Sequence, residues 1–131
     1  MPTIFTRLIN RELPSHIVAE DEVFFAFLDI RPIRPGHTLV IPKQEVDQFF
    51  DMDDDTLTRV LRFAKPITHA ILEVTGADRV GAVVAGFDVP HAHLHLIPAD
   101  TMADLDFARA KPAEPDDLKR MAESIRRALS Q

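Results

Sequence analysis

The stretch VPHAHLHLIP, residues 89–98, alternates histidine with small or apolar side chains at a strict two-residue period. Half of the chain's six histidines fall here, namely His91, His93 and His95. Only an extended strand places every second side chain on one face, so residues 91–98 are predicted to form a β-strand. The side chains between the histidines then face the opposite side of a sheet, where helices must cover them. These are Ala92, Leu94 and Leu96.

Hydrophobic spacing predicts further elements on both sides of this strand. An acidic turn at residues 20–22 joins two apolar runs within residues 16–30, a pattern typical of a β-hairpin. Two more apolar runs predict strands at residues 38–42 and 79–86, the second too apolar on both faces to stay exposed. A short helix is expected to end at Pro14, and residues 115–130 carry apolar side chains at helical spacing.

Residues 51–76 carry the strongest helix signal. Aliphatic side chains recur there at three- and four-residue steps, which predicts one buried face. Aspartates 53–55 suit the positive N-terminal end of the helix dipole, Gly76 suits its end, and Pro66 is expected to kink it. The predicted stripe consists of Leu57, Val60, Leu61, Ala64, Ile67, Ile71 and Leu72.

The order of these elements indicates the fold class. Strands without alternating βα units predict an α+β fold, with an antiparallel sheet of about five strands, a central helix and terminal helices. The chain has 131 residues, which favours a single domain over residues 1–131. The sequence motifs described below lie within residues 2–98. Residues 99–114 are predicted to be polar and irregular before the C-terminal helix.

Charge and composition exclude several classes of function. The formal net charge of −6 argues against nucleic acid and anionic membrane as partners, because phosphate contacts need clustered lysine and arginine. Cysteine is absent, which excludes disulfides, a thiol nucleophile and thiolate metal ligands. No apolar run approaches the roughly 20 residues of a membrane span, and no secretory signal pattern is seen. A cytoplasmic protein is expected.

Three interpretations of the histidine row compete. The row could be a polar outer face of the sheet that is rich in histidine. It could hold a metal, but three histidines in a row span about 13 Å, so one would be replaced by His37 or Asp29. It could instead perform covalent catalysis on phosphorus, with one neutral ring attacking while its neighbours donate hydrogen bonds to the phosphoryl oxygens.

The motif HAHLHLIP resembles the signature of the histidine triad (HIT) family of nucleotide hydrolases and transferases. The blocks IFTRLINRELPSHIVAEDE and AFLDIRPIRPGHTLVIPK are similar to the family's N-terminal and strand-loop-strand segments, in the same order. The resemblance covers residues 2–98. It implies a HIT-like fold, usually a homodimer whose sheets join across a two-fold axis, and a purine nucleotide as substrate.

The resemblance also implies roles for four histidines. His93 corresponds to the nucleophile that attacks the α-phosphorus and forms a nucleotidyl-histidine. His95 corresponds to the residue that binds phosphate oxygens and assists the leaving group. His91 and His37 correspond to the pair that orients and buffers the nucleophile.

Nucleotide binding is carried over in the same way. Asp29 corresponds to the acid that accepts hydrogen bonds from the ribose hydroxyls. The apolar slot for the base corresponds to Ile4, Phe5, Leu8, Phe27 and Ile30.

The chain departs from the family's pattern just before the triad. Many members carry an asparagine and a glycine-rich loop that ends in Gly-Gln, whereas this loop is shorter and has Ala85 near the asparagine position. Phe87 stands at the phosphate-contacting glutamine, so residues Phe87, Asp88 and Val89 form a possible phosphate loop with fewer polar groups. The carboxylate of Asp88 is expected to repel phosphate unless it points away.

These departures leave several functions open. The leading hypothesis is a hydrolase or nucleotidyl transferase acting on a nucleoside phosphoramidate, phosphosulfate or dinucleoside polyphosphate, without a cofactor. The alternatives are a nucleotide sensor with weak or no catalysis and a metal-dependent hydrolase. Zinc-binding members use N-terminal cysteines and a histidine after IPK; because Thr6 and Glu45 stand in those regions, no structural zinc is expected.

Overall fold

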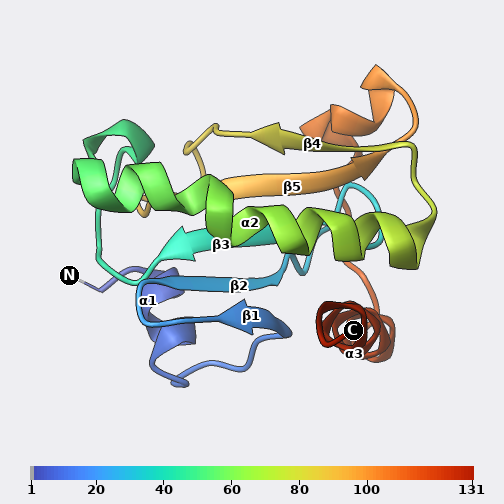
Figure 1. Cartoon of the computed structure of the whole chain (residues 1–131), viewed down its shortest axis with the longest axis horizontal. Coiled ribbons are helices and arrows are strands. Elements are labelled where there is room, and N and C mark those ends of the chain that lie inside the picture. Colours follow the sequence, from blue (N-terminus) through green and yellow to red (C-terminus); the bar gives the residue numbers. More distant parts are fainter. Residues whose placement is uncertain (1) are drawn as a thin grey trace.

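The computed structural model describes residues 2–131, which form an antiparallel sheet with helices on both of its faces (Figure 1). The strands are β1 (Ile17–Glu20), β2 (Phe24–Leu28), β3 (Thr38–Pro42), β4 (Arg79–Val83) and β5 (Leu94–Ala99). The α-helices are α1 (Ile4–Ile9), α2 (Asp54–Thr75) and α3 (Pro115–Leu129). The chain also contains three short 3-10 helices, η1 (Phe49–Asp51), η2 (Met102–Leu105) and η3 (Phe107–Arg109). The strand order is β1-β2-β3-β5-β4, which confirms the predicted α+β class.

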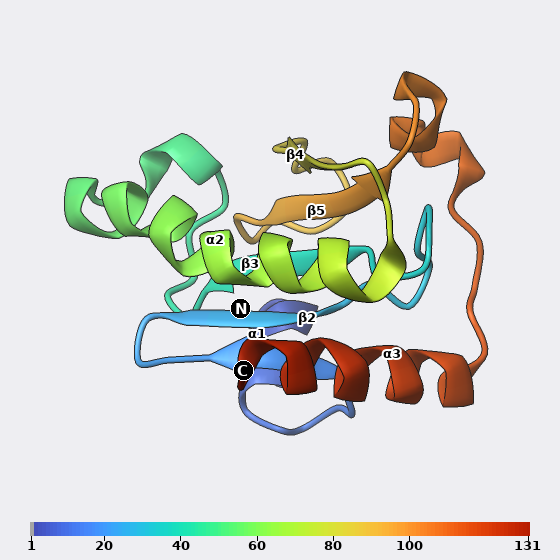
Figure 2. The ribbon, with the colours of Figure 1, turned by 45° about the vertical axis from the view of Figure 1, so that its right-hand side comes forward.

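The two faces of the sheet are covered by different helices. Helices α2 and α3 lie side by side on one face (Figure 2), where Leu94 and Leu96 join their main apolar cluster. Helix α1 covers part of the other face, where Phe5 packs with Phe27 and Leu39. Alternation within β2 and β5 therefore sends aliphatic side chains toward α2 and α3 and leaves His95 on the α1 face.

The register of the sheet aligns residues of four strands on the α1 face. Phe27 of β2 pairs with Leu39 of β3, and Leu39 pairs with His95 of β5. His95 in turn pairs with Val83 of β4. An apolar patch and a histidine thus become close neighbours across the sheet, although they are far apart in the sequence.

Local sequence signals explain where several elements begin and end. The carboxylate of Asp21 accepts hydrogen bonds from the backbone of Val23 and Phe24, which closes the predicted hairpin turn. Asp53 caps α2 by accepting from the Thr56 amide at 2.8 Å, and Gly76 ends the helix with a φ of 71°. Helix α2 is continuous through Pro66.

Some predicted boundaries and faces were wrong. Strand β5 begins at Leu94 and not at residue 91, because the His91 amide turns back to the Val89 carbonyl and the Ala92 amide bonds to Val46 outside the sheet. Leu61 is 65% exposed although it fits the helical period, because the buried stripe of α2 runs through Val60 and Ala64.

Three further expectations need correction. Helix α1 ends at Ile9, five residues before Pro14, because Arg11 adopts a φ of 63° that no helix continues through. Strand β4 ends at Val83; Arg79 and Ala82 are exposed and its other three residues are half-buried, so none of this strand is fully buried within one chain. Residues 99–114 include the ordered turns η2 and η3.

No helix within residues 2–131 combines the length and apolar character that crossing a bilayer requires.

Candidate active site

Four histidines meet on the α1 face of the sheet. The ring centroids of His93 and His95 lie 5.0 Å apart, and those of His37 and His95 lie 5.1 Å apart. Phe5 of α1 packs edge-on against His93 at 5.2 Å and against His91 at 5.7 Å. All four imidazoles are buried, which fixes their orientations before any ligand arrives.

One hydrogen bond sets the tautomer of His93. Its Nδ1 lies 2.7 Å from the backbone carbonyl oxygen of His91, and a carbonyl can only accept, so Nδ1 carries the proton. In the neutral ring, Nε2 therefore holds the lone pair. Nε2 has no hydrogen-bond partner within residues 2–131. Since every fully buried side-chain nitrogen or oxygen in that range has a partner, Nε2 is not fully buried and reaches solvent. In its neutral form, His93 therefore offers a nitrogen lone pair in a fixed direction.

A second chain of hydrogen bonds sets the tautomer of His95. The backbone amide of Ile33 donates to Nδ1 of His37 at 3.1 Å, so the proton of His37 lies on Nε2. This Nε2 donates to Nδ1 of His95 at 2.9 Å. The proton of His95 must then lie on its own Nε2. The relay from Ile33 to His95 thus presents a donor beside the acceptor nitrogen of His93.

Burial keeps the relay uncharged at neutral pH. Desolvation, together with a smaller effect of the neighbouring His95, lowers the pKa of His37 to about 3. Desolvation also lowers the pKa of His95 to about 4, with a contribution from His93. For His91, burial again dominates and lowers the pKa. Neutral rings are the form that the hydrogen-bond directions require.

The ring of His91 anchors the N-terminal helix. Its Nε2 donates to the Pro42 carbonyl at 2.8 Å, and its Nδ1 accepts from the Thr3 hydroxyl at 2.8 Å. Glu45 accepts from the Thr6 hydroxyl at 2.5 Å and from the Thr3 amide at 2.9 Å. Thr6 and Glu45, which stand in the regions of the zinc ligands of other members, are therefore joined by hydrogen bonds. This network holds α1, and with it Phe5, against the histidines.

An apolar cavity of about 220 Å³ opens beside the histidines, between α1 and β2. All six residues predicted to bind the nucleotide line it: Ile4, Phe5, Leu8, Phe27, Asp29 and Ile30. Phe5 and Phe27 are buried in its floor, whereas Ile4 and Ile30 are exposed at its mouth. The cavity is a slot with apolar walls and a carboxylate at one end.

Asp29 occupies that end of the slot. Its Oδ1 accepts from the Arg31 amide at 2.9 Å, and its Oδ2 lies 3.7 Å from Nε2 of His37. Burial is the main cause that raises the pKa of this carboxyl, and the charge of Asp88 adds to it. The side chain remains 22% exposed, so Oδ2 is accessible to a ligand in the slot.

Asp29, His37 and His95 also form the one group within residues 2–131 that could hold a metal ion, with ligand atoms within 4.8 Å of one another. The hydrogen-bond directions oppose it. To bind a metal through Nε2, His37 would have to move its proton to Nδ1, where it would face the amide hydrogen of Ile33. The metal interpretation of the histidine row therefore loses its best ligand set.

The predicted phosphate loop is only partly near the histidines. Phe87 is 94% exposed and lines a cavity of about 310 Å³ that also reaches His93. Asp88 is exposed, and its charge contributes to raising the pKa of both Asp29 and His95. Val89 packs against the apolar cluster of the slot.

Two residues of the site were not predicted from the sequence. Thr3 binds His91, and Phe107 of η3 packs edge-on against His95 with a centroid distance of 4.8 Å. A threonine three residues before another polar residue at a helix start is a capping signal, and it could have marked Thr3. No periodic pattern marks Phe107.

Comparison with known proteins agrees with this geometry. The family model of the HIT domain matches residues 10–102. A HIT-like protein of Borreliella burgdorferi is 42% identical over 102 residues, covering 72% of this chain and 73% of that protein. An adenosine 5'-monophosphoramidase of Schizosaccharomyces pombe is 30% identical and covers 95% of this chain and 96% of its own length. A histidine triad nucleotide-binding protein from Sulfolobus tokodaii superimposes with a TM-score of 0.86, at 32% identity, over 97% of this chain and 91% of its own.

Proposed function

Because the chain belongs to the histidine triad (HIT) family, we propose that it is a nucleotide hydrolase or nucleotidyl transferase that works through a covalent nucleotidyl-histidine. The observation that carries this proposal is the tautomer of His93. The His91 carbonyl holds the proton on Nδ1, which leaves a buried but accessible Nε2 lone pair next to a nucleoside-sized slot. A neutral, oriented nitrogen is what attack on phosphorus requires.

In the first step, Nε2 of His93 attacks the α-phosphorus, and the bond from phosphorus to the leaving group breaks. The bonding pair departs with the leaving group, which takes a proton from solvent. The His93 ring becomes positively charged, with Nδ1–H still donating to the His91 carbonyl, so this oxygen stabilises the new charge. Nε2–H of His95 is placed to donate to a phosphoryl oxygen or to the leaving group.

In the second step, water attacks the same phosphorus and the bond between phosphorus and Nε2 breaks. The electron pair returns to Nε2, the water proton is released, and a nucleoside monophosphate leaves. A nucleotidyl transferase would use another nucleophile in place of water. The His37 relay keeps His95 in one tautomer through both steps, because neither His37 nitrogen has to change its partner.

The slot supports a purine nucleoside as the recognised group. Its aromatic floor suits a flat base, and Asp29 at its end can accept from the two ribose hydroxyls. Because the register sets Leu39 of the slot beside His95, a nucleotide with its base in the slot would have its phosphorus near the histidines.

We favour a nucleoside phosphoramidate as the substrate, with an amine as the leaving group. The carboxylate of Asp88 acts on His95, and it would repel the extra negative charges of a polyphosphate leaving group but not an amine. The relative from S. pombe is named an adenosine 5'-monophosphoramidase, in agreement with this choice.

Trapping of the intermediate tests the function. The protein is mixed for milliseconds with a panel that includes an adenosine phosphoramidate, adenosine phosphosulfate and a dinucleoside polyphosphate, then denatured at alkaline pH. We expect an acid-labile nucleotide adduct on the peptide that contains His93, formed fastest from the phosphoramidate. Saturable binding without adduct or product would contradict the enzyme proposal and favour a nucleotide sensor. Turnover that a chelator abolishes would favour the metal-dependent alternative.

We also propose that the chain forms a homodimer through β4. Of the two edge strands, β1 is covered by α3, whose Arg126 donates to the Ile17 carbonyl, whereas the β4 edge has no neighbouring strand within residues 2–131. Open edges favour pairing with a second strand.

Sedimentation tests the proposed homodimer. Wild type should sediment as a dimer and Ala82→Glu, on the exposed side of β4, as a monomer, because like charges would meet across the axis. Gln44→Glu adds the same charge away from β4 and should stay dimeric. A wild-type monomer at micromolar concentration would contradict the proposal.

A further inference from the structure

Phe107 lies against the His95–His37 pair although it comes from the segment after the sheet. Its ring packs edge-on against His95 at 4.8 Å and against His37 at 6.4 Å. The side chain is 37% exposed, so one side covers the imidazoles and the other faces solvent. Phe107 thus closes the side of His95 that neither His37 nor His93 covers.

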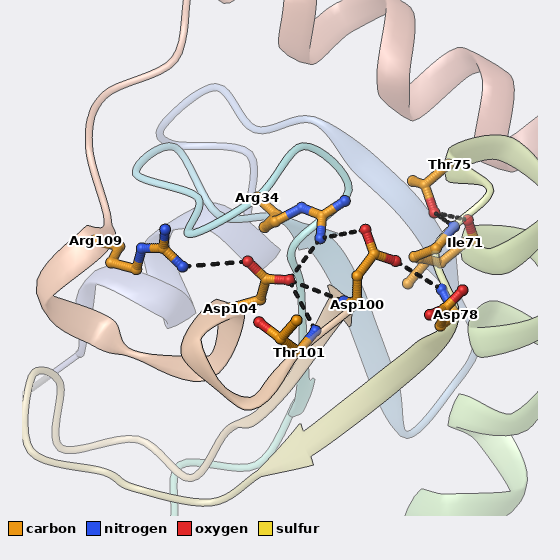
Figure 3. A network of polar contacts seen from close by, with 9 residues as sticks. Arg34, Ile71, Thr75, Asp78, Asp100, Thr101, Asp104 and Arg109 are labelled. Carbon is orange, nitrogen blue, oxygen red and sulfur yellow. Dashed lines mark hydrogen bonds and ion pairs between the residues drawn. The ribbon is translucent and has the colours of Figure 1, made fainter.

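A polar network fixes the segment that carries Phe107 (Figure 3). Asp104 of η2 accepts from the Arg34 guanidinium at 2.8 Å and from the amides of Asp100 and Thr101 at 2.9 and 3.2 Å. Its other oxygen accepts from Arg109 at 3.2 Å. We call Arg34, Asp100, Thr101, Asp104 and Arg109 the Asp104 clamp. Single surface ion pairs contribute little, but a carboxylate that accepts four hydrogen bonds is a fixed point.

The Asp104 clamp also joins the loop that holds His37. Arg34 lies three residues before His37, and its backbone carbonyl accepts from the His37 amide at 3.0 Å. On the far side of the clamp, Leu105 packs on Gly81 of β4 so closely that an added Cβ would lie 2.6 Å from it. The clamp therefore sets the position of Phe107 relative to the same loop that sets the His37 relay.

We propose that Phe107, held by the Asp104 clamp, is a positioning residue that keeps His95 desolvated and in its relay orientation. This inference rests on the proposed catalytic role of His95. The groups that face His95 are the rings of His37 and His93 and the charge of Asp88, with Asp29 next to His37. Among these neighbours Phe107 supplies the apolar cover.

The test combines NMR titration of His95 with kinetics on an adenosine phosphoramidate. In Phe107→Ala, water reaches His95, so the pKa of His95 should rise by about one unit or more above its lowered value. The rings of His37 and His95 should also lose their fixed orientation. We expect kcat to fall about tenfold with KM nearly unchanged, because the base slot does not include Phe107. Phe107→Leu should restore most of both values.

Two further variants complete the design. Arg34→Gln removes the ion pair with Asp104. It should raise the pKa of His95, as Phe107→Ala does, but by a smaller amount. Met102→Ala removes an exposed apolar side chain from the same segment and should leave His95 unchanged. The proposal is overturned if the pKa of His95 in Phe107→Ala equals that of wild type. It is also overturned if Met102→Ala changes this pKa by the same amount as Phe107→Ala. The titration needs no turnover, so it decides the role of Phe107 even if the chain hydrolyses no nucleotide.

Discussion

Replacement of His93 by alanine is expected to reduce turnover by about 10⁴-fold or more while nucleotide binding persists. The reason is chemical, since the variant lacks the nitrogen that we propose to bond with phosphorus. The variant removes the contact between Phe5 and the His93 ring, but Phe5 still packs on Phe27 at 5.4 Å and on His91 at 5.7 Å, so the slot should keep its shape. Stopped-flow measurement of product, with calorimetric measurement of nucleotide affinity, separates the two effects.

His69→Ala provides the matched control. It makes the same substitution at an exposed histidine of α2, away from the sheet face that carries the site. Its turnover should equal that of wild type. If His93→Ala and His93→Gly kept more than about a tenth of the wild-type rate, covalent catalysis by His93 would be refuted, because such losses fall far short of removing a nucleophile.

Replacement of His37 by alanine should have the next largest effect, a loss of about 10²-fold in kcat with a smaller change in KM. The half-buried amide of Ile33 and the buried Nδ1 of His95 both lose their partner, so His95 becomes free to place its proton on either nitrogen. Each unsatisfied group costs about 1–3 kcal/mol of unfolding free energy. Nitrogen chemical shifts of His95 report its tautomer directly, and thermal unfolding reports the stability.

The same variant changes how stability depends on pH. The pKa of His37 is about 3 in the folded chain and 6.5 in the unfolded chain, so the unfolded state binds more protons between these values. Wild type therefore loses stability as the pH falls from about 6.5 toward 3, and His37→Ala should lose it less steeply. His37→Gln, which can accept and donate, should recover part of the activity. An unchanged His95 tautomer and kcat in His37→Ala would disprove the relay.

Much of the fold follows from local patterns that depend on a single element. Alternation in residues 94–96 correctly predicted that Leu94 and Leu96 lie under the helices and that His95 lies on the other face, because strand geometry leaves no other choice. The start of this strand was wrong because Val46 takes the Ala92 amide, and such a contact leaves no trace in the period. Leu61 was misplaced because a helix with apolar residues on two sides has more than one possible stripe.

The site was less predictable than the fold. The resemblance named His37, Asp29 and the slot residues, and the structure brings them together, but their roles stay proposals. The directions of the hydrogen bonds could not be predicted, because the proton position on His93 depends on a backbone carbonyl and that on His95 depends on the Ile33 amide. Phe107 could not be found because short 3-10 turns have no repeating pattern and its contact with His95 is purely tertiary.

The cross-strand row of Phe27, Leu39, His95 and Val83 ties two tasks to a single alignment of strands. Insertion or deletion of one residue inside β3 would turn every following side chain of that strand over, and so exchange the set that faces α2 and α3 with the set that faces α1. If the proposed function holds, point substitutions in the slot can change the bound nucleoside while the alignment of the strands stays the same. A shift of one strand past another would preserve neither task.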